Sequence, residues 1–161
     1  MIYILEGADG TGKTTLARKI LDKTNGHYLH STYDRYWDIQ DYHQQIAESA
    51  ISLDIYQDVV IDRWALSELI YGNVFREGPS YNVETTLKNL DNEEWVTWIY
   101  CKNDNAIINH LRNKRKRNEM FNDMTEVTKE YDKYINISEL EWIIFDFNKH
   151  NLDDFVKDLL Q

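Results

Sequence analysis

The sequence is poor in cysteine, in long apolar runs and in basic residues, and each shortage excludes a class of protein. Its single cysteine, Cys101, excludes an intramolecular disulfide framework and a cysteine-based zinc site, and it is typical of a reducing cytoplasm. No stretch approaches the ~18 uninterrupted apolar residues of a membrane-spanning helix. A strand-like run starts at Ile2, so we expect no signal peptide either. Basic residues number 18 against 28 acidic ones, and the net charge of −10 disfavours duplex DNA as a general partner.

A chain of 161 residues with 42% hydrophobic content is long and apolar enough to fold as one globular domain. Five short apolar runs have the character of β-strands, and segments with helical periodicity lie between them. This alternation predicts an α/β fold over residues 1–161, in which helices cover both faces of a five-stranded parallel sheet. The expected strands are 2–5, 27–29, 59–61, 95–101 and 142–147. The expected helices are one that ends at Gly26 as C-cap, then 39–55, 64–75, 105–114, 124–135 with Asp123 as N-cap, and one after Asn151.

Three of the six glycines lie in one short segment directly after the first expected strand. Residues 7–14 read Gly-Ala-Asp-Gly-Thr-Gly-Lys-Thr, the G-x-x-x-x-G-K-[ST] pattern of a phosphate-binding loop. The glycines let the backbone turn tightly and bring its N–H groups onto phosphate oxygens. Lys13 then reaches the β and γ phosphates, and the Thr14 hydroxyl can ligate Mg²⁺. The sequence therefore predicts that Gly7, Ala8, Asp9, Gly10, Thr11, Gly12, Lys13, Thr14 and Thr15 bind a nucleoside triphosphate.

Two polar residues follow the third expected strand. Asp62 stands where a protein with such a loop needs a second group for Mg²⁺, and Arg63 would face the same crevice and grip an anionic acceptor through two hydrogen bonds. Asp9, inside the loop, is suited to accepting a hydrogen bond from a substrate hydroxyl. The alternatives are a solvated Asp-Arg pair at a strand end and an aspartate that satisfies backbone N–H groups of a turn.

A basic segment and a polar one complete the set of candidates. Residues 112–117 read Arg-Asn-Lys-Arg-Lys-Arg and hold five of the 18 basic residues. They are suited to a lid, at about 112–122, that closes over the triphosphate; the alternatives are a solvated charge run and a nucleic-acid patch. After the second strand, Tyr33, Asp34 and Arg35 could contact the base or phosphate of an acceptor. The five histidines have no metal-ligand spacing, and we interpret them as structural: His27, His30, His43, His110 and His150.

The chain resembles the P-loop kinases of the thymidylate kinase-like group, on three motifs in the right order. Residues 6–15, Glu-Gly-Ala-Asp-Gly-Thr-Gly-Lys-Thr-Thr, are similar to the group's E-G-x-D-G-x-G-K-[ST]-T. Residues 62–67, Asp-Arg-Trp-Ala-Leu-Ser, followed by Tyr71-Gly72, are similar to D-R-x-x-x-S-x-x-A-Y. The basic segment ends in Arg117-Asn118-Glu119 and is followed by Tyr131 and Tyr134, similar to the group's R-x-E and trailing tyrosine.

This resemblance implies a three-layer P-loop kinase fold and the ATP- and Mg²⁺-dependent phosphorylation of a deoxypyrimidine monophosphate such as dTMP. It implies that Asp9 contacts the deoxyribose 3′-hydroxyl, that Arg63 binds the acceptor phosphate, and that Trp64 and Tyr71 belong to the acceptor site. Gly10 leaves the loop without an arginine, so the catalytic arginine would come from the lid. The lid residues implied are Arg115 and Arg117 for catalysis and Arg112 for ATP binding. The group's habit of dimerising implies a homodimer.

The sequence is also compatible with other activities. The segment His30–Arg35 replaces the E-P-G-G-T-like sequence of the group, on the acceptor side. A deoxynucleoside kinase would need a carboxylate base near the end of the second strand, for which Asp34 is the candidate. A kinase for a modified pyrimidine, free or within DNA, and a nucleotide-dependent switch without transfer chemistry are the further alternatives.

Overall fold

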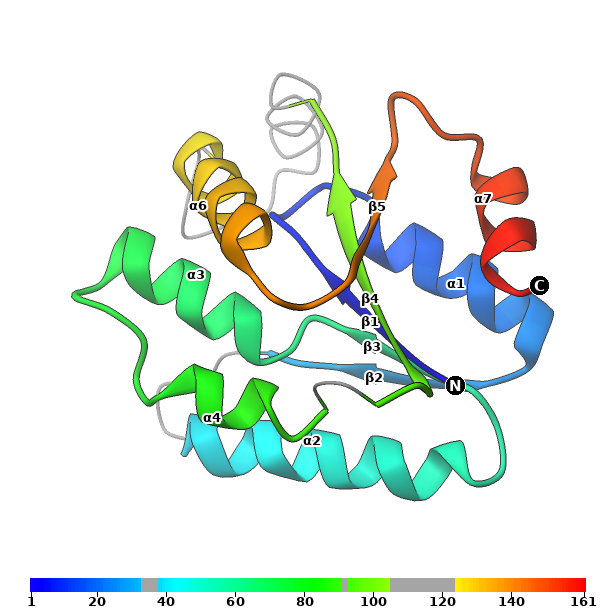
Figure 1. Cartoon of the computed structure of the whole chain (residues 1–161), viewed down its shortest axis with the longest axis horizontal. Helices are drawn as coiled ribbons and strands as arrows, with labels where there is room; N and C mark the ends of the chain where they lie inside the picture. The colour runs from blue at the N-terminus through cyan, green and yellow to red at the C-terminus, as the bar shows by residue number, and fades with distance from the viewer. Residues whose placement is uncertain (33–37, 91–92, 105–123) are drawn as a thin grey trace.

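Five parallel strands form a single sheet in the order β2-β3-β1-β4-β5 in the computed structural model, which describes residues 1–32, 38–90, 93–104 and 124–161. Helices cover both faces of the sheet, so the chain has the three-layer α/β architecture of a P-loop kinase (Figure 1), as the sequence predicts. The strands are β1 (Ile2–Glu6), β2 (His27–His30), β3 (Val59–Asp62), β4 (Val96–Lys102) and β5 (Trp142–Asp146).

The register of the sheet gathers the ends of three strands at one edge. Asp62 of β3 lies opposite Leu5 of β1 on one side and opposite His30 of β2 on the other. Every residue of β1 and β3 is buried, as expected for central strands covered on both faces. Because all strands are parallel, their carboxyl ends meet at the edge where the glycine-rich loop leaves β1, and this is where α/β proteins bind ligands.

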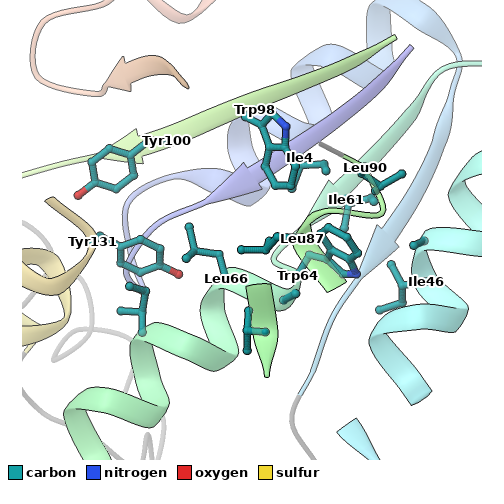
Figure 2. Packing of buried hydrophobic residues seen from close by; sticks show 14 of the residues in the cluster. Ile4, Ile46, Ile61, Trp64, Leu66, Leu87, Leu90, Trp98, Tyr100 and Tyr131 are labelled. Atoms are coloured by element: carbon teal, nitrogen blue, oxygen red, sulfur yellow. The ribbon is translucent and has the colours of Figure 1, made fainter. Parts of the chain in front are cut away.

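Two groups of helices cover the two faces. One face carries α1 (Lys13–Thr24) and α7 (Leu152–Leu159). The other carries α2 (Ile39–Asp54), α3 (Ala65–Phe75), α4 (Val83–Leu87) and α6 (Thr125–Ile137). The larger core lies on this second face. There Trp64 and Trp98 pack at 6.1 Å between ring centroids, and Leu66, Leu87 and Tyr131 belong to the same cluster (Figure 2).

Several boundaries differ from those that the sequence predicts. Helix α1 ends with Asn25 as the left-handed C-cap (φ 52°) instead of Gly26. Gly26 has a different role, because a Cβ there would lie 2.3 Å from the carbonyl oxygen of Asp58. Helix α6 begins after Met124, whose side chain makes no capping hydrogen bond, and Asp123 lies outside the described residues.

Helix α4 was not predicted, because five residues are too short to show a helical period. The helix expected over 105–114 and the lid expected at about 112–122 lie outside the described residues. None of the helices in the described part of the chain is long and apolar enough to cross a membrane.

Candidate active site

The glycine-rich loop joins β1 to α1 at the carboxyl edge of the sheet (Figure 1). Gly7, Gly10 and Gly12 have φ values of 144°, 84° and 89°, which residues with side chains rarely adopt. Space is a second constraint at two of them. A Cβ on Gly7 would lie 2.3 Å from the carbonyl oxygen of Cys101, and one on Gly12 would lie 1.9 Å from the ring of Phe147. The loop therefore requires glycine both for its dihedral angles and for its packing.

Lys13 is the first residue of α1, and its ammonium group folds back over the loop. It donates hydrogen bonds of 2.7 Å to the carbonyl oxygens of Gly7 and Ala8, and the residue is only 5% exposed. The first turn of α1 holds no acidic residue, so the positive end of the helix dipole adds to the charge of Lys13. The loop, the lysine and the helix start form a site suited to the phosphates of an anionic ligand.

Asp62 ends β3 beside this loop, and its two carboxylate oxygens have different surroundings. Oδ2 accepts hydrogen bonds from the Thr14 hydroxyl at 2.7 Å and from the Tyr28 hydroxyl at 2.8 Å. Oδ1 is buried and has no hydrogen-bond partner among the described residues. A buried carboxylate oxygen without a partner is costly, so this atom needs a ligand. Carboxylate and hydroxyl oxygens are hard donors, and Mg²⁺ is commonly held by one carboxylate together with phosphate oxygens. Thr14 and Asp62 therefore fit the ion that the sequence predicts.

Tyr28 is a member of this group that the sequence analysis missed. It lies opposite Val60 in the sheet register, two residues before Asp62, so its side chain points to the same face of the sheet as Asp62. Burial, and then the hydrogen bond to Asp62, raise the pKa of the Tyr28 hydroxyl to about 12, so this hydroxyl remains a donor at neutral pH. The period-2 alternation of β2 was the available signal, but it is informative only once β2 is known to pair with β3.

Arg63 follows Asp62 and has a left-handed backbone conformation, with φ at 70°. Its guanidinium group pairs with the Asp9 carboxylate, and Nη2 lies 3.5 Å from the Tyr71 hydroxyl. The guanidinium carbon lies 5.3 Å from the centroid of the Tyr71 ring, a cation–π distance. The Tyr71 hydroxyl also accepts a 3.2 Å hydrogen bond from the Asp9 N–H. The fold therefore joins three predicted acceptor-site residues from three separate segments beside the phosphate loop.

Trp64 does not belong to this crevice. Its side chain is completely buried in the core among the residues shown in Figure 2, and its indole N–H donates a 2.8 Å hydrogen bond to the carbonyl oxygen of His43. The expectation that Trp64 contacts the acceptor is wrong for the side chain, because the turn that directs Arg63 to the crevice directs the next residue inward.

The remaining predicted site residues are six that lie outside the described part of the chain and two threonines of the loop and α1. Tyr33, Asp34 and Arg35 at the end of β2, and Arg112, Arg115 and Arg117 of the expected lid, lie outside the described residues. Thr11 is buried and donates a 2.9 Å hydrogen bond from its hydroxyl to the carbonyl oxygen of Ala8, inside the loop. Thr15, the third residue of α1, is exposed.

Similar structures have this architecture. The YorR protein of Bacillus subtilis, in complex with phosphorylated GDP, superposes with a TM-score of 0.78 at 17% identity, over 99% of this chain and 94% of that chain. A deoxyadenosine kinase from M. mycoides superposes with a TM-score of 0.62 at 15% identity, over 99% and 96% of the two chains. Thymidylate kinase from Ehrlichia chaffeensis gives 0.60 at 13% identity, over 100% and 98%. At identities this low, the superpositions show a shared fold alone, that of a P-loop kinase.

Sequence comparison adds a family. Among curated proteins, none matches this chain. The family model described as Zeta toxin matches residues 1–103, which include the phosphate loop, the Asp62-Arg63 turn and Tyr71. This match covers well over half of the sequence and contains the described groups that surround the crevice. The chain belongs to the Zeta toxin family.

Proposed function

We propose that this protein is a phosphotransferase that moves the γ-phosphoryl group of ATP, with Mg²⁺, to a deoxynucleoside monophosphate, with dTMP or a related pyrimidine nucleotide as the leading acceptor. One observation carries the proposal: the Arg63 guanidinium, paired with Asp9 and packed on Tyr71, lies beside a complete phosphate loop. A protein that only binds a nucleotide has no need of a second anion-binding group at this position.

The donor side would use the loop. Its N–H groups, the ammonium of Lys13 and the start of α1 would bind the triphosphate. Thr14 and the Oδ1 atom of Asp62 would hold Mg²⁺, which, when bound, neutralises charge on the β and γ phosphates. Within the described residues, no cluster of three His, Cys, Asp or Glu side chains could hold a metal without the substrate. This favours an ion that arrives with the nucleotide.

The acceptor side would use Arg63, whose planar guanidinium matches the two oxygens of a phosphate. An oxygen of the acceptor phosphate would attack the γ-phosphorus, the bond to the β–γ bridging oxygen would break, and ADP would leave. A phosphate nucleophile is already deprotonated at neutral pH, so positioning and charge stabilisation are enough and no base is needed. This agrees with the ion pair of Asp9, which engages a carboxylate that could otherwise act as a base.

A deoxynucleoside kinase is the second candidate, because the fold is shared with a deoxyadenosine kinase. A nucleoside hydroxyl must lose a proton, so this reaction requires a carboxylate base. Asp9 is paired with Arg63, and Asp62 accepts from Thr14 and Tyr28, which leaves Asp34 as the candidate base. Asp34→Asn should abolish a nucleoside kinase and only weaken a monophosphate kinase.

The test is ADP release with ATP, Mg²⁺ and one acceptor at a time. The acceptors are the deoxynucleoside and guanosine monophosphates, 5-hydroxymethyl-dUMP, the corresponding nucleosides and a DNA duplex. We expect turnover with one or more monophosphates. In Arg63→Ala this turnover should fall by about 100-fold or more while ATP still binds. Arg76→Ala is the matched control. Arg76 forms an ion pair with Glu68, with 2.8 Å between Nη2 and Oε1, and this pair is not part of the phosphate loop.

Three results would reject the proposal. Turnover with nucleosides alone would assign the chemistry to a nucleoside kinase. Full activity in Lys13→Ala would show that the loop does not bind the transferred phosphate. Tight ATP binding without turnover of any acceptor would favour a nucleotide-dependent switch.

A further inference from the structure

Glu6 is a buried acidic residue that the proposed reaction does not use. It is the last residue of β1, directly before the phosphate loop, and it is 0% exposed. Burial raises the pKa of its carboxyl group above the ordinary value. An acidic side chain buried to this extent is rare unless each of its oxygens is satisfied.

Three segments satisfy the Glu6 carboxyl group. Its Oε1 atom accepts a 2.9 Å hydrogen bond from the backbone N–H of Trp64. Its Oε2 atom accepts hydrogen bonds from the hydroxyls of Ser67 at 2.7 Å and Tyr131 at 3.0 Å. These donors belong to the turn after β3, to α3 and to α6. One side chain of β1 therefore connects the Arg63 turn to a helix that lies far away in the sequence.

Two residues of β1 accept hydrogen bonds from the backbone of the turn at Arg63. The N–H of Arg63 donates a 2.9 Å hydrogen bond to the carbonyl oxygen of Leu5, and the N–H of Trp64 donates to Glu6. Arg63 itself has a φ of 70°, which a residue with a side chain adopts only when its surroundings enforce it. The last two residues of β1 therefore hold the left-handed residue from both sides.

We propose that Glu6 is a positioning residue that keeps Arg63 in this left-handed conformation and couples it, through Tyr131, to the position of α6. The inference rests on the proposed function in one respect, namely that Arg63 binds the acceptor. Glu6 touches no substrate in this scheme, because it is fully buried and acts through the peptide group of Trp64. A Glu6 that served only stability would affect donor and acceptor binding alike.

Glu6→Gln and Glu6→Ala separate the hydrogen bonds from the charge. A glutamine amide can still accept from the Trp64 N–H and can donate to either hydroxyl, so Glu6→Gln should keep acceptor KM within about threefold of wild type. Glu6→Ala leaves the Trp64 N–H unpaired. It should raise the acceptor KM by about tenfold or more, with the ATP dissociation constant changed by less than about threefold.

Tyr131→Phe tests the link to α6 and keeps the inference testable where Glu6→Ala does not fold. It should raise the acceptor KM by about threefold. Its control is Tyr100→Phe, because the Tyr100 ring stacks on Tyr131 at 5.7 Å between centroids (Figure 2) but its hydroxyl donates to Asp132 and not to Glu6. Tyr100→Phe should leave the acceptor KM unchanged.

Amide hydrogen exchange measures the same link without catalysis. The exchange rate of the Trp64 N–H is compared with that of the Ile99 amide in the sheet. Relative to wild type, it should rise by about tenfold or more in Glu6→Ala and by about threefold in Tyr131→Phe. In Glu6→Gln it should equal the wild-type rate. Unchanged exchange at Trp64 in both Glu6→Ala and Tyr131→Phe would overturn the inference, as would equal losses of ATP and acceptor binding. If wild type phosphorylates no monophosphate, the proposed function fails, and exchange still decides whether Glu6 holds the turn.

Discussion

Below neutral pH, the wild-type protein should lose folding stability because of His43, and a His43→Gln variant should not show this loss. His43 is 3% exposed, and its ring nitrogens lie 3.0 Å from the Ser31 hydroxyl and 2.7 Å from the Tyr81 hydroxyl. Burial lowers the pKa of His43 from 6.5 to about 4, against an opposing effect of the Glu68 charge. The native state therefore keeps the imidazole neutral at pH values where the unfolded chain protonates it.

The size of the effect follows from these two pKa values. His43 contributes its full stability above the unfolded pKa of 6.5 and loses it as the pH falls toward about 4. At pH 5 the unfolded imidazole is protonated and the native one is not. The difference of about 1.5 pH units, at ~1.4 kcal/mol each, gives a loss of about 2 kcal/mol.

Urea unfolding of wild type and His43→Gln at pH 7.5 and pH 5 measures this loss, with tryptophan fluorescence as the signal. Glutamine can bond to both hydroxyls but does not titrate, so the packing cost of the substitution cancels between the two pH values. Wild type should lose about 2 kcal/mol more than the variant on going to pH 5. A double difference below about 0.5 kcal/mol would show that His43 titrates normally in the fold.

Two further predictions concern the loop and the metal site. Tyr28→Phe removes one of the two donors to Oδ2 of Asp62. It should weaken Mg²⁺ binding by about threefold to tenfold, measured by calorimetry in the presence of a non-hydrolysable ATP analogue. Unchanged affinity would exclude a role for this hydroxyl. Gly12→Ala should lower the free energy of unfolding by about 3 kcal/mol or more, because its methyl group would overlap the Phe147 ring as well as strain the backbone. Gly78→Ala is its control, with φ at 126° but open space around a Cβ, and should lose only about 1 kcal/mol; equal losses would contradict the packing argument.

The parts of the fold that could be predicted are those with local signals. The β1 and β3 strands are continuous apolar runs, and the loop between β1 and α1 has a glycine and lysine spacing that phosphate binding requires. The sequence therefore predicted the two strands and the loop. The meeting of Asp9 and Arg63 could also be anticipated, because motifs at the carboxyl ends of parallel strands converge. Tyr71 lies within α3, and only the family resemblance indicated that it belongs to the same site.

The parts that could not be predicted depend on contacts between distant residues. Glu6 is part of the phosphate-loop motif, but the motif does not indicate its hydrogen bond to Tyr131. That contact depends on how α6 packs against the sheet. Tyr28 was assigned to a weak strand and gained a role only from the register with β3. Trp64 follows Arg63 in the sequence, and nothing local indicated that the turn would send the two side chains to opposite sides.

The position of β1 in the sheet has a consequence for how the protein folds. The strand that ends in the phosphate loop lies between β3 and β4, so Ile2 pairs with Val59 on one side and with Val96 on the other. Neither partner is nearby in the chain, and closing such long loops precedes any gain from pairing, which makes folding slow. During synthesis, β1 can pair with β3 once that strand has emerged, but its other side has no partner until β4 follows. The apolar β1 would therefore keep one side exposed until β4 is in place, and the loop that follows β1 would lack complete support until then.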